Sequence, residues 1–346
     1  MVGCGPAGAS AAAAAARTGC AVLLLDKRRS AGTPVQCAEF VSAALSLDAV
    51  PWAAVTSQPI ERMVTLVEGR EPRITENFRG RMISRARFDR ALADDAVAHG
   101  ARCLTDTAVV SIDDDGGVRL SNGAEVRPRV LIGADGPQSR VGAAVGRRNT
   151  ELVAARQLTV PLTDPHDATD IFLRACYPGG YGWLFPKGPF ANLGIGVEHR
   201  RRDRLKPLLD ALRAELTAAG RLAPGSATSL TGGLIPVGGR LPACARLREV
   251  PVLLAGDAAG LTNPVTGAGI ESAVRSGTLA GIAAAGWLAG AAAALDDYEE
   301  ELSSLYDASF ARALRWRRAL EGAEPGEELL RRAWISSPEY WSDRAA

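Results

Sequence analysis

A glycine-rich turn at the start of the chain constrains the fold more than any other feature of the sequence. The chain opens MVGCGPAGASAAAAAA, in which Gly3, Gly5 and Gly8 form the pattern G-x-G-x-x-G ahead of an alanine-rich run. Glycines at this spacing occupy the turn between a buried strand and a dinucleotide-binding helix. Only Met1 and Val2 precede the turn. We therefore expect a dinucleotide site whose first strand is nearly missing.

The residues after the turn strengthen this interpretation. The alanine-rich run predicts a helix to about Thr18, which Gly19 would end. Residues 21–26 (AVLLLD) then predict a buried parallel strand. Asp26 follows Gly8 at the distance where an acid hydrogen-bonds a ribose hydroxyl. We assign nucleotide binding to Gly3, Gly5, Ala7, Gly8 and Asp26.

Composition excludes several other classes of protein. The chain has 346 residues, 47% of them hydrophobic, which is enough for a large core in two or three lobes. Its net charge of +1 gives no field that would attract nucleic acid. The six cysteines form no C-x-x-C pair and no cluster with histidine, so we expect no metal site and no disulfide framework. A reduced, cytosolic protein fits best.

Three stretches permit a membrane interpretation. The basic runs 199–204 and 312–318 read as solvated helix faces, with contact to an anionic head group or a membrane surface as the alternative. Residues 276–295 lack charge but consist mostly of alanine and glycine, which contribute little transfer energy. We expect a buried or interfacial helix there rather than a transmembrane span.

Two further turns combine glycine with an acid. VLIGADG (130–136) predicts a strand that ends in a turn at Asp135, and residues 250–260 predict another ending at Gly256 and Asp257. A carboxylate at such a turn accepts hydrogen bonds from sugar-type hydroxyls. Gly267 and Gly269 then open a helix whose N-terminus stabilises negative charge. Two backbone anion cradles and two carboxylates fit a long dinucleotide such as FAD.

The remaining pattern predicts an interrupted domain. A helix should start near Arg85 with the buried stripe Phe88, Leu92, Ala96 and Val97. Residues 151–240 predict an antiparallel sheet and an amphipathic helix over 203–220. We therefore expect the fold class α/β for the dinucleotide-binding part and α+β for the chain overall. We expect a Rossmann-like FAD-binding domain (1–48, 80–150 and 245–295), an antiparallel-sheet substrate domain (49–79 and 151–244) and a helical tail (296–346).

The three glycine–acid turns lie at residues 3–8, 133–140 and 255–273. They resemble those of FAD-dependent oxidoreductases of the aromatic-hydroxylase type. In that group the first turn holds the ADP pyrophosphate, the second lies near it, and the third binds the ribityl chain and flavin. Taken singly, Asp135 reads equally as a turn residue and Arg85 as a surface residue. The resemblance adds these cofactor-binding residues to the first five: Cys37, Ala38, Arg85, Val109, Asp135, Gly256, Asp257, Gly267, Gly269 and Ile270.

A narrower resemblance points to the geranylgeranyl reductase family. Its mark P-x-x-Y-x-W-x-F-P is matched at residues 178–186 and is followed by G-x-G. Residues 37–42 (CAEFVS), residues 232–239 (GGLIPVGG) and the R-x-x-F-D start of the helix at Arg85 also match. Phe40 departs from the pattern, which has a glycine there, and we expect its ring to narrow or reshape the substrate tunnel.

The resemblance implies reduction of carbon–carbon double bonds in an isoprenoid or lipid-like chain. Reduced FAD would supply hydride, and NADPH or another reductant would supply the electrons. We assign Tyr181, Cys37 and Trp183 to the catalytic site, with Tyr181 and Cys37 as candidates for handling the proton. Tyr181, Trp183 and Phe185 share one face of a strand, where they would form an aromatic wall. The alternatives are that these rings fill a domain interface and that Cys37 is a small buried hydrophobe.

Competing functions stay open at this point. A flavin monooxygenase of a small apolar substrate would share all three turns, and an electron-transfer or non-redox flavoprotein is a third option. We expect a monomer in the cytosol, with peripheral membrane contact if the substrate lies in a membrane. From Met1 and Val2 we expect a start several residues upstream in the natural protein.

Overall fold

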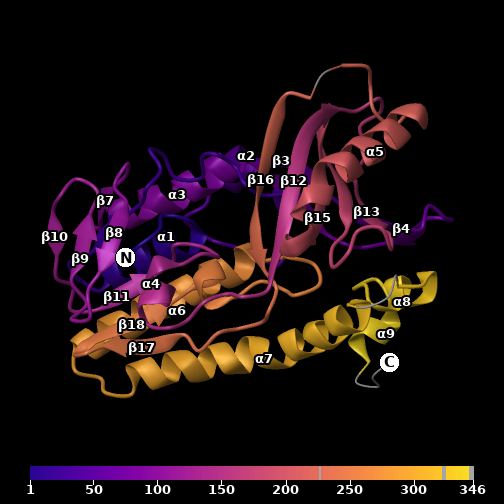
Figure 1. Cartoon of the computed structure of the whole chain (residues 1–346). Helices are drawn as coiled ribbons and strands as arrows, with labels where there is room; N and C mark the ends of the chain where they lie inside the picture. Colours follow the sequence, from indigo (N-terminus) through magenta and orange to yellow (C-terminus); the bar gives the residue numbers. More distant parts are fainter. Residues whose placement is uncertain (226, 322–324, 343–346) are drawn as a thin grey trace.

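The computed structural model describes residues 1–225, 227–321 and 325–342. Its first lobe is built on short parallel strands, in which β1 (Leu23–Leu25) pairs with β7 (Arg102–Leu104) and β11 (Leu131–Gly133) pairs with β18 (Val250–Leu254). The antiparallel strand β17 (Cys244–Leu247) lies beside β18. Figure 1 shows this lobe beside a second lobe that contains the large sheet.

Val2 joins the two halves of the parallel sheet. It forms parallel bridges to both Leu25 and Gly133, and its N–H donates to the carbonyl of Ile132 at 2.9 Å. The N–H of Gly3 donates to the carbonyl of Leu25 at 2.7 Å. Met1 and Val2 therefore occupy the position between β1 and β11 from which the glycine turn starts.

Close helix packing supports the glycine turn. Helix α1 (Pro6–Arg17) is alanine-rich, and all its residues from Ala7 to Ala16 are buried. Helix α6 (Ile270–Leu288) approaches so closely that a Cβ on Gly277 would lie 2.1 Å from the carbonyl oxygen of Ala7. Small side chains on both helices make this contact possible, so the alanine run serves packing as much as helix propensity.

Helix α3 (Arg85–Ala98) packs on the other side of α1 and confirms the predicted start at Arg85. Its stripe of Phe88, Leu92 and Ala96 is buried, but the prediction for Val97 was wrong because that side chain is 49% exposed. A small antiparallel sheet follows, formed by β8 (Val109–Ile112), β9 (Val118–Leu120) and β10 (Glu125–Val126). Helix α4 (Arg140–Ala144) starts just after the second glycine turn.

The second lobe is a seven-stranded sheet in the order β16-β12-β15-β14-β13-β4-β5. Its pairs are antiparallel except for β13 with β4. Helix α5 (Leu205–Ala218), preceded by the 3₁₀ segment η1 (His199–Arg204), covers one face with a buried stripe of leucines. The other face is free to line a cavity. The strands are β4 (Arg62–Val67), β5 (Arg73–Thr75), β12 (Leu152–Pro161), β13 (Ala168–Leu173), β14 (Gly182–Lys187), β15 (Phe190–Glu198) and β16 (Ser229–Pro236).

A small sheet lies against this lobe. It has the order β2-β6-β3, formed by β2 (Phe40–Ser42), β6 (Gly80–Ile83) and β3 (Thr56–Ile60), with the short helix α2 (Trp52–Val55) ahead of β3. Strand β14 contacts both β3 and β6. The segment that begins at Cys37 thus enters the second lobe directly before β2.

The C-terminal helices connect the lobes, as Figure 1 shows, with α7 (Ala294–Leu320) running from β17 to α8 (Glu327–Arg332) and α9 (Pro338–Trp341). The solvated-face interpretation of residues 312–318 was wrong for Arg317, which is buried. Trp316 and Trp334 are buried too, whereas Trp341 is exposed. In the described part of the chain, no helix combines the length and apolarity needed to cross a membrane.

Candidate active site

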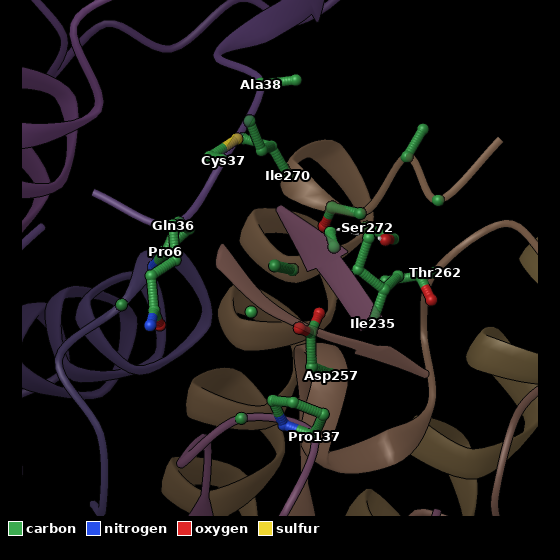
Figure 2. A pocket seen from close by; sticks show the side chains of 18 of the residues that line it. Pro6, Gln36, Cys37, Ala38, Pro137, Ile235, Asp257, Thr262, Ile270 and Ser272 are labelled. Carbon is green, nitrogen blue, oxygen red and sulfur yellow. Dashed lines mark hydrogen bonds between the residues drawn. The ribbon is translucent and has the colours of Figure 1, made fainter. Parts of the chain in front are cut away.

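One cavity of about 1180 Å³ runs between the lobes. Figure 2 shows side chains from separate parts of the chain around it, among them Cys37, Asp257 and Ile270. Two of the predicted site residues, Gly8 and Gly256, do not line it. The structure brings together these predicted residues along the cavity: Gly3, Gly5, Ala7, Asp26, Cys37, Ala38, Arg85, Val109, Asp135, Tyr181, Trp183, Asp257, Gly267, Gly269 and Ile270.

The first turn is held in a shape that only glycine permits. Gly3 has a φ of +97°, and a Cβ there would lie 2.2 Å from the carbonyl oxygen of Ala134. A Cβ on Gly8 would lie 1.7 Å from the carbonyl oxygen of Gly3, so Gly8 is a packing residue of the turn. The Asp26 carboxylate accepts hydrogen bonds from the N–H groups of Cys4 at 2.8 Å and Arg28 at 2.7 Å. These bonds fix its orientation at the cavity wall.

The second and third turns are tied to each other. Asp135 accepts from the Ser139 hydroxyl and from the N–H of Arg140 at 2.7 Å, so it caps helix α4 while it lines the cavity. The side-chain amide of Asn149 donates to the carbonyls of Pro137 at 3.0 Å and Asp257 at 2.8 Å. This amide holds the two acidic turns side by side.

Burial changes the acidity of the third turn. It raises the pKa of the Asp257 carboxyl to about 6, although the nearby charge of Arg85 acts in the opposite direction. On a guanidinium burial has the opposite effect, and on its own it would lower the pKa of Arg85. The charge of Asp89 and its hydrogen bonds raise the pKa above its ordinary value instead. Arg85 is therefore a fixed cation at the cavity, paired with Asp89 at 2.8 and 2.9 Å.

Glu39 anchors the segment that carries Cys37. It is buried with a φ of +71°, and its carboxylate accepts from the N–H of Arg85 at 2.9 Å and from the amide of Asn192 at 3.0 Å. Lys187 forms an ion pair with the same carboxylate. The Sγ of Cys37 accepts from the N–H of Glu39 at 3.1 Å. The thiol is thus held in place at the cavity by a buried, charged network.

The face of the large sheet that α5 does not cover forms another wall of the cavity. Strand register places Trp183 between Gly194 of β15 and Ile171 of β13. A Cβ on Gly194 would lie 2.2 Å from the indole, so this glycine makes room for the ring. The Tyr181 hydroxyl donates to the carbonyl of Thr266 at 2.6 Å, which joins the wall to the third glycine turn. Burial raises the pKa of Tyr181 well above its usual value.

Two amides in this wall were missed by the sequence analysis. Gln157 of β12 accepts from the Trp183 indole and donates to the carbonyl of Cys37 at 3.1 Å, and Asn192 of β15 donates to the carbonyl of Ala38 at 3.1 Å. Both are buried. A signal was present, since each is a polar residue on the cavity face of a largely apolar strand. Their partners lie on a distant segment that the sequence does not reveal.

The residues present fit FAD. Backbone N–H groups at the starts of α1 and α6 suit phosphate groups, and the carboxylates of Asp26 and Asp257 suit hydroxyl groups. A side chain on Gly3 would collide with the Ala134 carbonyl and one on Gly277 with the Ala7 carbonyl, so both glycines keep the backbone of the first turn in place. The aromatic wall suits a flat ring and an apolar chain.

Comparison with known proteins agrees with this arrangement. Residues 53–313 match the model of the FAD binding domain family, and residues 1–63 match that of an NAD(P)-binding Rossmann-like domain. A solved structure, a geranylgeranyl bacteriochlorophyll reductase-like protein from Thermoplasma acidophilum, superposes with a TM-score of 0.84 at 26% identity, over 97% of this chain and 90% of the other. The fold and site therefore define an FAD-dependent oxidoreductase.

Curated relatives narrow the class. Digeranylgeranylglycerophospholipid reductase 2 of Methanopyrus kandleri is 35% identical over 314 residues, which cover 82% of this chain and 76% of the relative. Digeranylgeranylglycerophospholipid reductase 1 of the same organism is 32% identical, over 99% of this chain and 98% of the relative. The chain belongs to the geranylgeranyl reductase family of FAD-dependent oxidoreductases. A probable FAD-dependent monooxygenase from Pseudomonas aeruginosa, with a TM-score of 0.70 at 20% identity over 95% of this chain and 96% of its own, shares the fold.

Proposed function

We propose that this protein reduces carbon–carbon double bonds in geranylgeranyl-type chains carried on a lipid. One observation carries the proposal: the Tyr181 hydroxyl bonds to Thr266, so the aromatic wall is continuous with the turn that suits the flavin end of FAD. The names of the relatives give the same substrate class. A flat wall beside a flavin suits an extended apolar chain.

When bound, reduced FAD supplies a hydride to one alkene carbon. The chain's own residues have three tasks: they hold the alkene against the wall, exclude water and oxygen, and admit a proton to the other carbon. We propose that Cys37, or a water ordered beside it, admits this proton. The Tyr181 hydroxyl already donates to Thr266 and its pKa is raised, so we give Tyr181 and Trp183 the task of positioning the chain.

The electron donor and the cellular setting are part of the same proposal. NADPH is the donor to test first, with a reduced protein carrier as the alternative. We also propose that the protein is a cytosolic monomer. A lipid substrate favours peripheral contact with a membrane, and the exposed Trp341 is a suitable contact residue. Sedimentation with vesicles of anionic phospholipid tests this setting, and Trp341→Ala should reduce the bound fraction.

Product analysis tests the activity. Holoenzyme is reduced without oxygen and incubated with a geranylgeranyl glycerophospholipid, and the product should gain two hydrogens for each bond reduced. Cys37→Ala should lower the rate at unchanged flavin content, whereas Cys176→Ala, which does not line the cavity, should leave it unchanged. A product that forms only with oxygen and carries an oxygen atom would instead show a monooxygenase.

A further inference from the structure

The aromatic wall has a direction. Tyr181, Trp183 and Phe185 alternate on one face of the segment that enters and forms β14, and all three line the cavity. Tyr181 is bonded to the third glycine turn through Thr266. Phe185 lies four residues further on, which is about 13 Å along a strand. The cavity therefore has an arm that leads away from the third glycine turn and reaches Phe185.

Two more phenylalanines meet Phe185 there. Phe40 of β2 stacks on Phe78, with ring centroids 5.4 Å apart and an angle of 10° between the planes. Phe40 also contacts Phe185 edge-on, with centroids 6.2 Å apart. Gly80 accommodates the Phe40 ring, because a Cβ on it would lie 2.4 Å from two ring carbons. Three rings from three separate segments thus meet at this point of the arm.

Apart from Thr169 of β13, which also lines the cavity, the side chains beside the three rings are apolar. Met63 of β4 and Ile171 of β13 line the cavity and belong to the same hydrophobic cluster as the three rings. An apolar chain that enters the arm gains free energy for each carbon that leaves water, and this gain stops where the rings block further entry. The position of the rings therefore limits how far a chain can be threaded past the third turn.

We propose that the stacked pair Phe40–Phe78 is a stop that determines substrate length, and thereby which double bond of the chain is held beside the third glycine turn. This inference rests on the proposed function, because it assumes that an isoprenoid chain occupies the arm. Phe40 and Phe78 are specificity residues here, since they end the chain's path and take no part in bond making.

Binding of prenyl alcohols tests the stop without any turnover. The holoenzyme is titrated with geraniol, farnesol and geranylgeraniol in their saturated forms, and the change in total tryptophan fluorescence is recorded, to which Trp183 and Trp334 at the cavity contribute. Affinity of the unmodified protein should rise with chain length and then level off. In Phe40→Ala it should keep rising, so that the longest alcohol binds about tenfold more tightly than to the unmodified protein.

Controls keep the test decisive. Phe78→Ala should act in the same direction and serves if Phe40→Ala does not fold, which flavin content and melting temperature report. Phe190→Ala removes an exposed ring that does not line the cavity and should leave the length dependence unchanged. An unchanged length dependence in folded Phe40→Ala and Phe78→Ala would overturn the stop. Failure of the unmodified protein to bind any prenyl alcohol would overturn the proposed function instead.

Discussion

The indole Nε1 of Trp183 donates a hydrogen bond of 2.9 Å to Oε1 of Gln157, and Nε2 of the same side chain donates one to the carbonyl of Cys37. This buried amide connects the aromatic wall to the segment that carries the candidate thiol. One side chain therefore helps to position both the Trp183 ring and the Cys37 segment. The same segment is held a second time by Asn192 and Glu39.

Removal of the Gln157 amide should destabilise the protein. In Gln157→Leu the buried indole N–H and the Cys37 carbonyl both lose a partner, and we expect a loss of about 1–3 kcal/mol in the free energy of unfolding. Denaturant unfolding of the flavin-free protein measures it. Gln138→Leu, at an exposed position, should change stability by less than about 0.5 kcal/mol. Equal effects in the two variants would contradict the account.

The ion pair of Lys187 with buried Glu39 should matter far more than a surface pair. Lys187→Met leaves a buried carboxylate without its cation, and we expect a loss of about 3 kcal/mol. The matched control is Lys206→Met, which breaks an exposed pair with Asp210 and should cost less than about 1 kcal/mol. Addition of Glu39→Gln to the Lys187 variant should recover part of the loss. No recovery would show that the charge is not the cause.

The approach of helices α1 and α6 should tolerate no side chain at Gly277. A Cβ there would lie 2.1 Å from the Ala7 carbonyl, so Gly277→Ala must separate the helices and displace the first glycine turn. We expect a loss of about 3 kcal/mol and reduced flavin content. Gly286→Ala in the same helix meets nothing closer than the Ala294 side chain, at 3.3 Å, and should change stability by less than about 1 kcal/mol. Melting temperature and the flavin-to-protein ratio report both effects.

Stability should depend on pH through Asp257. Burial raises its pKa from 3.8 to about 6, so the folded protein binds more protons than the unfolded chain between these values. This carboxyl therefore costs stability as pH rises from about 4 to about 6, by at most about 3 kcal/mol. Asp257→Asn should remove that component, so the difference in stability between the two flavin-free proteins should grow in favour of the variant up to about pH 6. A constant difference would contradict the pKa shift.

Much of this fold is readable from local pattern. The spacing of Gly3, Gly8 and Asp26 and the strand that ends at Gly256 predict the dinucleotide lobe, because each motif is contained in a short segment. Gln157 and Glu39 could not be assigned in this way, since each has a partner more than a hundred residues away: the Cys37 carbonyl for Gln157 and the Asn192 amide for Glu39. The prediction that Val97 is buried was wrong for a related reason. Helical periodicity predicts a buried stripe, but the width of the stripe depends on what packs against the helix.

The role of Met1 and Val2 also needed the tertiary structure. Two residues are too few to predict a strand, yet Val2 bridges β1 and β11 because both neighbours present unpaired backbone groups there. We expected a longer strand to be required. Insertion of apolar residues ahead of Met1 tests whether flavin occupancy and melting temperature rise.

Flavin reoxidation tests the central claim most directly. The holoenzyme is reduced with dithionite in the absence of oxygen and mixed with a geranylgeranyl glycerophospholipid, and the flavin absorbance is followed. Our account predicts that the oxidised flavin spectrum returns with the lipid alone, in proportion to the double bonds reduced, and more slowly in Cys37→Ala. A flavin that stays reduced until oxygen is admitted would contradict it.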